Sequence, residues 1–482
     1  MPAPATKPSG GRIAALRRTY EPQLRNLRGS DTAKAAGLAA AMIANNVIAL
    51  GSTVVFARLL SDYGSLAALI SYFLILSVAG QAIQLATARE GVLGHLGVGP
   101  GLIATLRRWT TTMVYFTLAL TVISVVLRQP IADAVGVKHD PWAAAIGLPA
   151  GCLWLELSIL RGALQGIGDY KAVGLSLIFE QGSRLIAGAA LAAAGLGVTG
   201  AYLGTPLSFI AMCIYCAVAL RRHVEQVTGE PLERGRVESA ALGLWTHVRR
   251  SWVPICGLIV FAVLQNIDII AAKHRMGGVK DLASSYAATA VAAKVLIWVA
   301  VGAGLYLVPE VSRGRAEGKD TRPVLFRALG IILVCAVPVL LIFAVAAKPL
   351  LRIAFGSNRT LASSSLLVLG LAFTVLACTY LAIQYMLAQK RAWFLLVIGA
   401  VAVAEPILLL NASRDPASFA AVVLGVQVVG AVLAFGMALR NPRRPPTATS
   451  PGTLEASAIN GTPDIQPPAR PPRATAGSTQ RG

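Results

Sequence analysis

The sequence predicts an all-α polytopic membrane protein with about twelve transmembrane helices in two six-helix lobes. Apolar residues form 55% of the 482-residue chain, and they are grouped in runs of about 20, the length of helix that crosses the hydrocarbon core of a bilayer. Only 13% of the residues are charged, which is about half the share usual in soluble domains. The distribution of Lys and Arg along the chain supports the number of spans.

The apolar runs follow one another with mostly short connections. In chain order they lie at 36–57, 64–86, 110–127, 142–161, 172–194, 199–220, 252–272, 284–307, 325–346, 362–387, 392–410 and 417–438. The longer connections are 87–109, 128–141 and 221–251. Four runs contain proline, which removes a backbone donor and can kink a helix. These candidate hinges are Pro149, Pro206, Pro338 and Pro406.

The basic residues gather on one of the two sides that these spans define. Most of the 43 Lys and Arg residues fall in one set of segments. This set comprises 1–35, 87–109, 161–171, 221–251, 312–327, 388–391 and the C-terminal tail. Because Lys and Arg are enriched on the cytoplasmic side of membrane proteins, we expect both termini in the cytoplasm. The net charge of +21 then faces the anionic inner leaflet, so we expect anionic lipids, and no nucleic acid, as partners of the basic loops.

The longest basic connection divides the chain into two halves of six spans each. The predicted organisation is a basic cytoplasmic segment (1–35), an N-lobe (36–220), an inter-lobe loop (221–251), a C-lobe (252–440) and a Pro-rich cytoplasmic tail (441–482) that we expect to be disordered. Six is an even number, so both lobes enter the membrane from the same side, as parallel repeats do in transporters. All six cysteines fall in apolar runs, where Cys behaves as a small apolar residue, and we expect neither disulfides nor a metal site.

Charged residues inside spans are the first candidates for function, because a charge in the bilayer core costs a few kcal/mol and is usually placed against a partner or a wet cavity. Lys294 in span eight could meet a phosphate in a central cavity, and Asp268 in span seven could hold Lys294 or bind a coupling cation. Asn266, two residues before Asp268, is a further candidate to contact the substrate in this cavity. The alternative is a structural ion pair that joins spans seven and eight.

Other polar residues in the spans leave two interpretations open. Glu180 and Arg184 have the i, i+4 spacing of a helical ion pair, although the Arg184 guanidinium also suits a phosphate. Arg58 ends span one as an anchor or a ligand. Buried carboxyl groups that could carry a coupling ion, or complete internal polar networks, are Glu156 and Glu405. Amides that could bind a sugar, or join helices by hydrogen bonds, are Asn45, Asn46, Gln81 and Gln84.

Several short stretches, taken in order along the chain, carry a family resemblance. They are Ala57-Arg58-Leu59-Leu60, Asp62-Tyr63-Gly64-Ser65-Leu66-Ala67-Ala68-Leu69, Arg161-Gly162-Ala163-Leu164-Gln165-Gly166, Gln265-Asn266-Ile267-Asp268, Lys294-Val295-Leu296, Val308-Pro309-Glu310 and Leu350-Leu351-Arg352-Ile353-Ala354-Phe355-Gly356. With the twelve-span topology, they resemble the oligosaccharide flippases, the O-antigen and teichoic acid exporters, of the multidrug/oligosaccharidyl-lipid/polysaccharide (MOP) exporter superfamily. The chain differs in its short first outer loop (61–64), and it lacks the two extra C-terminal spans of lipid II flippases.

The resemblance implies a fold like that of the multidrug (MATE) members of the superfamily and a transporter without cofactors. Its substrate would be a polyprenyl-phosphate-linked oligosaccharide that crosses the bacterial cytoplasmic membrane by alternating access, driven by Na⁺, H⁺ or the membrane potential. We expect a monomer that works with envelope polysaccharide synthesis enzymes. A high content of Ala, with Arg more frequent than Lys, agrees with a bacterial source.

Three alternatives have their own expectations. A MATE-type cation-coupled small-molecule antiporter would have acidic residues in its cavity. A non-transporting scaffold for cell-envelope synthesis would act through its basic tails. A membrane glycosyltransferase or polymerase would need a sizeable catalytic outer loop, whereas His139 and Asp140 are the obvious reactive groups of the longest predicted outer loop.

Overall fold

Helices form every regular element in the part of the chain that the computed structural model describes, which is residues 31–228, 243–250, 252–317, 319–389 and 393–440. In chain order the α-helices are α2 (Asp31–Leu59), α3 (Tyr63–Val92), α4 (Pro100–Val126), α5 (Arg128–Val135), α6 (Pro141–Gly166), α7 (Tyr170–Leu191), α8 (Gly197–Thr228), α9 (Leu244–Arg250), α10 (Trp252–Met276), α11 (Leu282–Ala293), α12 (Val295–Ala316), α13 (Arg322–Phe355), α14 (Leu366–Ala388), α15 (Phe394–Leu410) and α16 (Pro416–Leu439). Short helical turns are η1 (Ala192–Leu196), η2 (Ser357–Arg359) and η3 (Ser363–Ser365).

Ten segments of the described residues are long and apolar enough to cross a membrane. One of them, Tyr170–Thr228, contains both α7 and α8, and α15, with 17 residues, is a shorter apolar helix. Each of the twelve predicted runs therefore coincides with helical structure, and the prediction of an all-helical membrane fold is confirmed. The predicted N-terminal segment up to residue 30, most of the inter-lobe loop (229–242) and the tail (441–482) lie outside the described residues.

The α7–α8 segment is a tight antiparallel hairpin. Gly195 and Gly197 have φ of +97° and +51°, which L side chains rarely adopt, and they turn the chain between the two helices. A Cβ atom on Gly204 would lie 2.6 Å from the Gly188 nitrogen and 2.7 Å from the Arg184 carbonyl oxygen. Small residues at this crossing let the two backbones approach closely, as is usual between membrane helices.

Two predicted connections contain more helix than the sequence indicated. The connection 87–109 shrinks to a short turn, because α3 continues to Val92 and α4 already begins at Pro100. The added helical turns carry exposed basic side chains such as Arg89 and Arg107, which have no place in hydrocarbon but suit helix ends that leave the membrane. The connection 128–141 likewise contains α5.

One helix kink lies near a proline that was not among the predicted hinges. In α13 the backbone leaves helical geometry at Ala346 (φ −122°, ψ 25°), three residues before Pro349, and α13 also contains Pro338. A proline ring clashes with the preceding turn of helix and removes one backbone bond, so Pro349, which the sequence analysis did not select, accounts for the kink. The eighth run is also interrupted, since α11 and α12 meet at Lys294.

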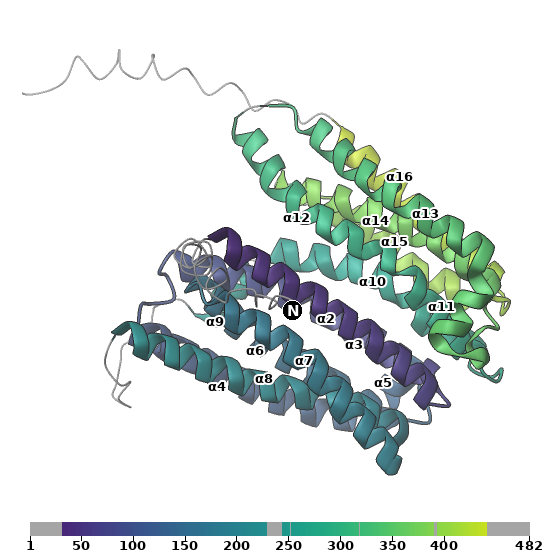
Figure 1. Ribbon diagram of the computed structural model, residues 1–482, viewed down its shortest axis with the longest axis horizontal. Helices are drawn as coiled ribbons and strands as arrows, with labels where there is room; N and C mark the ends of the chain where they lie inside the picture. Colours follow the sequence, from purple (N-terminus) through teal and green to yellow (C-terminus); the bar gives the residue numbers. More distant parts are fainter. Residues whose placement is uncertain (1–30, 229–242, 251, 318, 390–392, 441–482) are drawn as a thin grey trace, which may run out of the picture. The chain divides into compact units, whose positions relative to one another are not determined.

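The helices pack as two groups that meet along α3 and α10 (Figure 1). In the first group α3 packs on α6, and α7 packs on α2 and α8; in the second, α10 packs on α15, and α12 and α13 pack on α14. These contacts group the helices in the same way as the two predicted lobes. The residues at which each lobe begins and ends stay a prediction. By internal contacts the chain divides into a unit that ends at Ala438 and a second unit, Leu439–Gly482.

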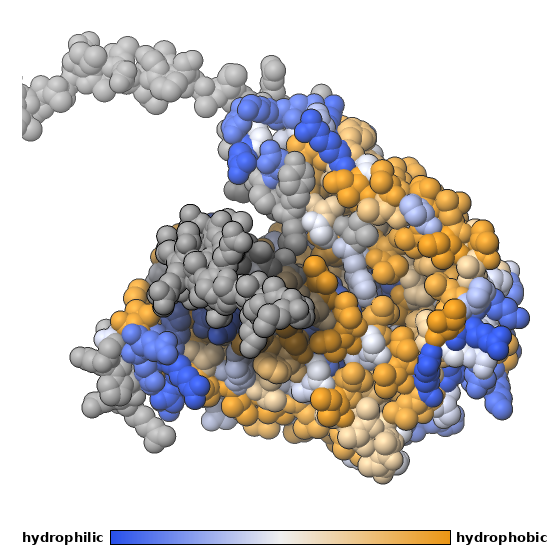
Figure 2. Space-filling view, in the orientation of Figure 1, coloured by the Kyte–Doolittle hydropathy of each residue, from blue (hydrophilic) through white to orange (hydrophobic). Residues whose placement is uncertain are grey.

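The outer surface is that of a membrane protein. Figure 2 shows hydrophobic side chains over the middle of the visible face and hydrophilic side chains gathered toward its ends. Large apolar side chains are exposed along α4 and α13, for example Val126 at 70% and Val345 at 88%. Exposed apolar surface of this extent is expected only against lipid or a partner. The chain is therefore a multi-pass membrane protein.

Candidate functional site

A buried ion pair joins α10 to the junction of α11 and α12. Lys294 Nζ lies 3.1 Å from Asp268 Oδ1, with the two side chains 10% and 0% exposed. The ammonium also lies 5.2 Å from the centre of the Phe373 ring on α14, within the range of a cation–π contact. Lys294 lies at the interruption between α11 and α12, and its side chain reaches Asp268 on α10. Asn266 is buried too, but its amide donates to the Ala262 carbonyl one turn back on α10, at 3.0 Å.

A second carboxyl group belongs to the same region of the structure. Glu405 on α15 is fully buried, and its Oε1 accepts a hydrogen bond of 3.0 Å from Gln427 on α16. The Gln427 amide also donates to the Leu264 carbonyl at 3.1 Å. Glu405 is close enough to Asp268 and Lys294 to interact with both electrostatically. This set, Asp268, Lys294, Glu405 and Gln427, is the C-lobe cluster.

A second buried cluster, formed by Arg161, Glu180 and Arg184, lies in the first helix group. Glu180 Oε1 accepts from Arg184 Nη2 at 2.5 Å, as the i, i+4 spacing predicted, and Glu180 Oε2 lies 3.0 Å from Arg161 Nη1. Arg161 also donates to the Ser176 hydroxyl and carbonyl, at 2.8 Å and 2.9 Å. Two guanidinium groups therefore share one carboxylate. We call these three residues the N-lobe cluster.

Sequence reasoning missed Arg161. It placed the residue at the cytoplasmic end of span four, whereas α6 continues to Gly166 and leaves Arg161 inside the helix with a side chain that is 1% exposed. The available signal was the Ser176 to Glu180 spacing on the next span, which puts a hydroxyl and a carboxylate on one helix face opposite Arg161. A single sequence gives no direct evidence that these faces meet.

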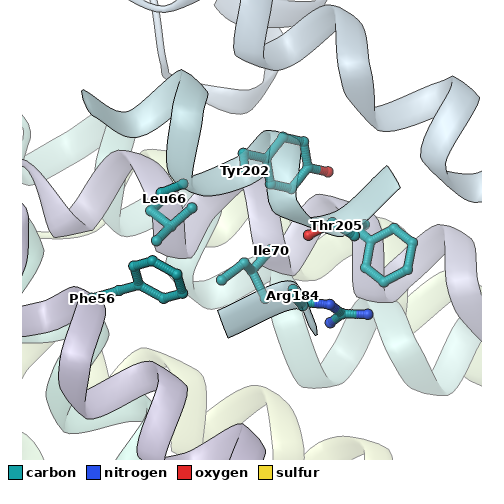
Figure 3. Close-up of a pocket in the computed structure, with 8 residues that line it drawn as sticks. Phe56, Leu66, Ile70, Arg184, Tyr202 and Thr205 are labelled. Carbon is teal, nitrogen blue, oxygen red and sulfur yellow. The ribbon is translucent and has the colours of Figure 1, made fainter. Parts of the chain in front are cut away.

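Arg184 lines a small cavity between α2, α3, α7 and α8 (Figure 3). The cavity volume is about 30 Å³, which is room for about one water molecule. The Arg184 guanidinium lies over the Phe209 ring at 5.1 Å, its Nε is without a hydrogen-bond partner, and its side chain is 20% exposed. Tyr202, whose buried hydroxyl is also unpaired, lines the same cavity. Arg184 thus keeps donor capacity beyond its ion pair.

The remaining predicted polar residues are on three helices of the first group, α6, α2 and α3. Glu156 on α6 accepts a hydrogen bond of 2.5 Å from the Thr110 hydroxyl on α4, and its second oxygen is unpaired. Asn45 and Asn46 are half-buried on α2, where one amide donates to the other at 3.5 Å. On α3, Gln81 is exposed and Gln84 is half-buried.

The two helix groups are joined at one end by charged residues, in an arrangement that we call the end lock. Lys273 at the end of α10 lies 2.8 Å from both carboxylate oxygens of Asp62, the N-cap of α3. Burial raises the pKa of Asp62, but hydrogen bonds from Lys273 and Ser65 outweigh it, so that this pKa lies below its usual value. Burial and the nearby charge of Asp62 raise the pKa of Asp140. By the predicted topology this end is the outer one.

Arg359 is the central residue of the end lock. Its guanidinium donates to the carbonyl oxygens at the end of α2, at 3.2 Å to Ala57, 2.7 Å to Leu60 and 3.1 Å to Ser61. It also pairs with Asp281 at 2.9 Å, and Arg359 is only 5% exposed. Helix-end carbonyls lack partners within the helix and carry partial negative charge, so a cation is well placed here.

Two further contacts complete the end lock. The Ser284 hydroxyl on α11 accepts from the Gly64 nitrogen on α3 at 2.9 Å. Arg58 donates to the carbonyls of Ile353 and Ala354 at the end of α13, at 2.5 Å and 3.1 Å. Arg58 was predicted as an anchor or a ligand, and in the structure its guanidinium holds a helix end of the second group.

Comparison with known proteins identifies the fold. No family model and no curated protein matches the chain. Among solved structures, the chain is similar to the lipid II flippase MurJ in an inward closed conformation, with a TM-score of 0.63 and 14% identity over 84% of this chain and 88% of that chain. It is also similar to an inward-facing multidrug resistance MATE family transporter of the MOP superfamily, with a TM-score of 0.61 and 14% identity over 82% of this chain and 93% of that chain.

The fold is therefore that of the MOP-type transporters. An outward-facing MATE family transporter matches with a TM-score of 0.51, at 14% identity over 90% of this chain and 98% of that chain.

Proposed function

We propose that the protein is a flippase that moves a polyprenyl-phosphate-linked oligosaccharide across the bacterial cytoplasmic membrane by alternating access. The observation that carries the proposal is the N-lobe cluster, in which Arg161 and Arg184 share the single carboxylate of Glu180. One positive charge remains in a site lined by aromatic rings. Guanidinium groups bind phosphate oxygens in a bidentate manner, so the excess charge suits the anionic head of a lipid-linked substrate.

Arg184 is the residue that we assign to the substrate phosphate. Its side chain is more exposed than that of Lys294, at 20% against 10%, and it has an unpaired donor beside a cavity. Lys294, the first candidate from the sequence, lies close to two carboxyl groups, Asp268 and Glu405, which leave its cluster without excess positive charge. In this proposal the glycan crosses between the lobes while the lipid tail stays in the bilayer.

Opening and closing of the end lock would give access from alternate sides. The pair of Asp62 and Lys273 is partly exposed to water, so it opposes the opening of the end lock only weakly. The proposed topology has both termini in the cytoplasm, and the basic inner segments contact anionic lipids. We further propose that the protein acts as a monomer beside envelope polysaccharide synthesis enzymes.

Flipping of a fluorescent polyprenyl-diphosphate oligosaccharide in proteoliposomes tests the proposal. We expect Arg184→Gln to reduce the flipping rate at least about tenfold, since a charge-assisted contact contributes about 1.5–3 kcal/mol, and Arg184→Lys to restore only part of it. Arg327→Gln, which removes an exposed arginine of α13, is the matched control and should flip at the normal rate. Normal flipping by Arg184→Gln contradicts the assignment, and no flipping by the wild-type protein contradicts the function.

A MATE-type antiporter for organic cations is the second candidate, because the C-lobe cluster contains two buried carboxyl groups and MATE transporters share the fold. It predicts that overexpression raises resistance to cationic drugs. In that case Asp268→Asn would abolish resistance, and depletion of the protein would leave lipid-linked glycans unchanged. Accumulation of a lipid-linked glycan on the inner leaflet after depletion favours the flippase. A scaffold, the third alternative, would lose its effect on deletion of residues 441–482, whereas a transporter would keep its activity.

A further inference from the structure

The short helix α9 has a buried face and an exposed face, and it lies in a segment that we predict to be cytoplasmic. His247 is buried: its Nε2 lies 3.1 Å from the Thr87 hydroxyl on α3, and its ring stacks on Trp109 of α4 with 5.3 Å between the ring centres. Trp245 and Arg249 are four residues apart, so they share one side of the helix, and both are exposed. His247 thus anchors α9 on the first helix group and leaves Trp245 and Arg249 on a face away from this anchor.

The first turn of α10 forms a groove with the exposed face of α9. Trp252 is exposed, and Ile255 and Cys256 follow it at the i+3 and i+4 positions, which lie on the same side of a helix. The groove has a volume of about 380 Å³, which is within the range of roughly 300–1,000 Å³ usual for ligand pockets. Its lining residues are Trp245, Val248 and Arg249 of α9 and Trp252, Ile255 and Cys256 of α10. We call it the α9–α10 groove.

The lining of the α9–α10 groove suits a lipid at the membrane interface. Two exposed indole rings, at 80% for Trp245 and 55% for Trp252, form an apolar surface that is expected against lipid or a partner. Tryptophan is enriched at the depth where acyl chains meet headgroups.

Arg249 shows which part of a lipid the groove can recognise. A guanidinium in the bilayer core costs a few kcal/mol, so this residue belongs at headgroup depth. Within the described residues, Arg249 makes no ion pair with a carboxylate, and its charge is available to an anion. A guanidinium binds phosphate oxygens through strong, charge-assisted hydrogen bonds. An apolar groove with one guanidinium in its wall is therefore complementary to an acyl chain that ends in a phosphate headgroup.

We propose that the α9–α10 groove binds an anionic phospholipid of the cytoplasmic leaflet, such as phosphatidylglycerol. An acyl chain lies between the indole rings of Trp245 and Trp252, and the phosphate contacts Arg249. The occupant is a phospholipid of the membrane and not the transported lipid, because Arg184, which we assign to the substrate phosphate, lines a different cavity between α2, α3, α7 and α8. Binding in the groove does not depend on which substrate the protein moves.

The two walls of the groove belong to different helix groups. α9 is anchored on α3 and α4 of the first group through His247, whereas α10 packs on α15 of the second group. Trp252 begins α10, and Lys273 of the end lock lies 21 residues further along the same helix, which is about 30 Å at the rise of an α-helix. A lipid held between the walls therefore joins the two groups at the end opposite to the end lock.

Modification of Cys256 by N-ethylmaleimide tests the site, because this half-buried thiol lines the groove. The full chain, with its other five cysteines replaced, is kept in dodecyl maltoside, and phosphatidylglycerol or phosphatidylcholine is added. Phosphatidylglycerol should slow the modification about threefold at a concentration of about twice its Kd. Phosphatidylcholine at the same concentration should have little effect, because its headgroup carries no net charge.

Arg249→Gln tests the headgroup contact. Modification in detergent alone should keep its rate, since the thiol and the groove are unchanged. About ten times more phosphatidylglycerol should be needed for the same protection, because a charge-assisted hydrogen bond is lost. Arg128→Gln is the matched control, since Arg128 also lies beside an exposed indole, 5.0 Å from the ring centre of Trp142, but outside the groove. Its protection by phosphatidylglycerol should equal that of the parent protein.

His247→Ala tests whether the anchored helix α9 forms one wall of the site. This variant should lose the protection of Cys256 by phosphatidylglycerol, because α9 is released from α3 and α4. His95→Ala, which removes an exposed histidine in the turn after α3, should keep it. Protection that persists in His247→Ala overturns the anchoring of the groove.

Three further outcomes overturn the proposal. Equal protection by the two phospholipids contradicts the contact between the headgroup and Arg249, and no protection by either contradicts the site. Protection by a polyprenyl phosphate, but not by phosphatidylglycerol, would mean that the groove holds the transported lipid. The phospholipid measurements use no transport substrate, so their failure and failure of the flipping assay are separate outcomes.

Discussion

Lys273 lies 2.8 Å from both carboxylate oxygens of Asp62, across the contact between the two helix groups. The same carboxylate caps α3, since its oxygens accept from the backbone and hydroxyl of Ser65 at 3.1 Å and 2.7 Å. Asp62 therefore fixes the first turn of one helix and holds the end of another. The side chain of Asp62 is 45% exposed and that of Lys273 is 12% exposed. Water therefore weakens the pair, and we expect it to contribute at most about 1 kcal/mol.

A weak pair of this kind can regulate closure without dominating the fold. We expect Asp62→Asn to open the end lock more often and to speed the labelling of Ser284→Cys by a membrane-impermeant maleimide, in a variant whose native cysteines are replaced. Ser284 is 4% exposed in the closed arrangement. The expected increase is roughly two- to fivefold, the equivalent of the energy of one partly exposed pair.

Asp415→Asn is the matched control for this labelling. Asp415 also accepts from a serine at the start of a helix, through the Ser418 nitrogen and hydroxyl at 2.9 Å and 2.8 Å. This contact lies at the start of α16 and does not join the two helix groups. Labelling of Ser284→Cys should stay at the original rate in Asp415→Asn. An equal increase in both variants would mean that capping, and not the contact with Lys273, determines closure.

The pH dependence of closure follows from the lowered pKa of Asp62. The ionised carboxylate is the form that binds Lys273, so its stabilisation is complete above the ordinary value of 3.8 and is lost as the pH falls through the lower value in the folded protein. Closure should therefore be constant between about pH 5 and 8 and decrease only in stronger acid. The distance between spin labels on the exposed residues Lys138 and Gly278 measures this opening. In Asp62→Asn the acid-induced change should be absent, and a transition near neutral pH would contradict the prediction.

Arg359 should be more important for stability than Lys273. Its guanidinium is buried and serves three carbonyls and Asp281. Removing one partner of a buried pair costs about 3–5 kcal/mol, so we expect Arg359→Ala to lower the thermal unfolding midpoint by several degrees. Arg359→Lys should recover only part of the loss, because an ammonium cannot reach both α2 and Asp281 with the geometry of a planar fork. Exposed Arg352→Ala on α13 is the control. Equal midpoints for the two alanine variants would contradict this role.

The sequence was sufficient to predict the helices but insufficient to predict the end lock that joins the two helix groups. Apolar length alone located the helices of the twelve predicted spans, because the bilayer leaves helices as the way to satisfy the backbone, but it did not predict the short helices α5 and α9 in the connections. Asp62 and Lys273 are 211 residues apart, and each ends or begins a run, where a charge is ordinary and carries no signal of a partner. Arg359 stands in a short connection, where an arginine usually meets water.

The candidate clusters were only partly predictable, for a similar reason. The i, i+4 rule relates residues of one helix, so it found Glu180 with Arg184. Depth in neighbouring spans related Lys294 to Asp268. Arg161 and Gln427 reach their carboxyl groups across helix contacts, and neither composition nor periodicity states which helix faces meet. The boundary of α6 mattered most, because an error of a few residues placed Arg161 at the membrane surface.

The close crossing of α7 and α8 gives a last prediction, which links helix packing to the N-lobe cluster. A Cβ on Gly204 would lie within 2.8 Å of three backbone atoms, those of Gly188 and Arg184. Backbone cannot move aside as a side chain can, so Gly204→Ala must push the helices apart, at about 1–3 kcal/mol. Because Arg184 contributes one of those atoms, its guanidinium should shift relative to Glu180 and the flipping rate should fall together with the unfolding midpoint. Gly182→Ala, on α7 where a Cβ would meet nothing within 4 Å, should leave both unchanged or raise stability slightly, since alanine favours helix. If Gly204→Ala keeps both the midpoint and the rate of the wild-type protein, the tight hairpin does not position Arg184.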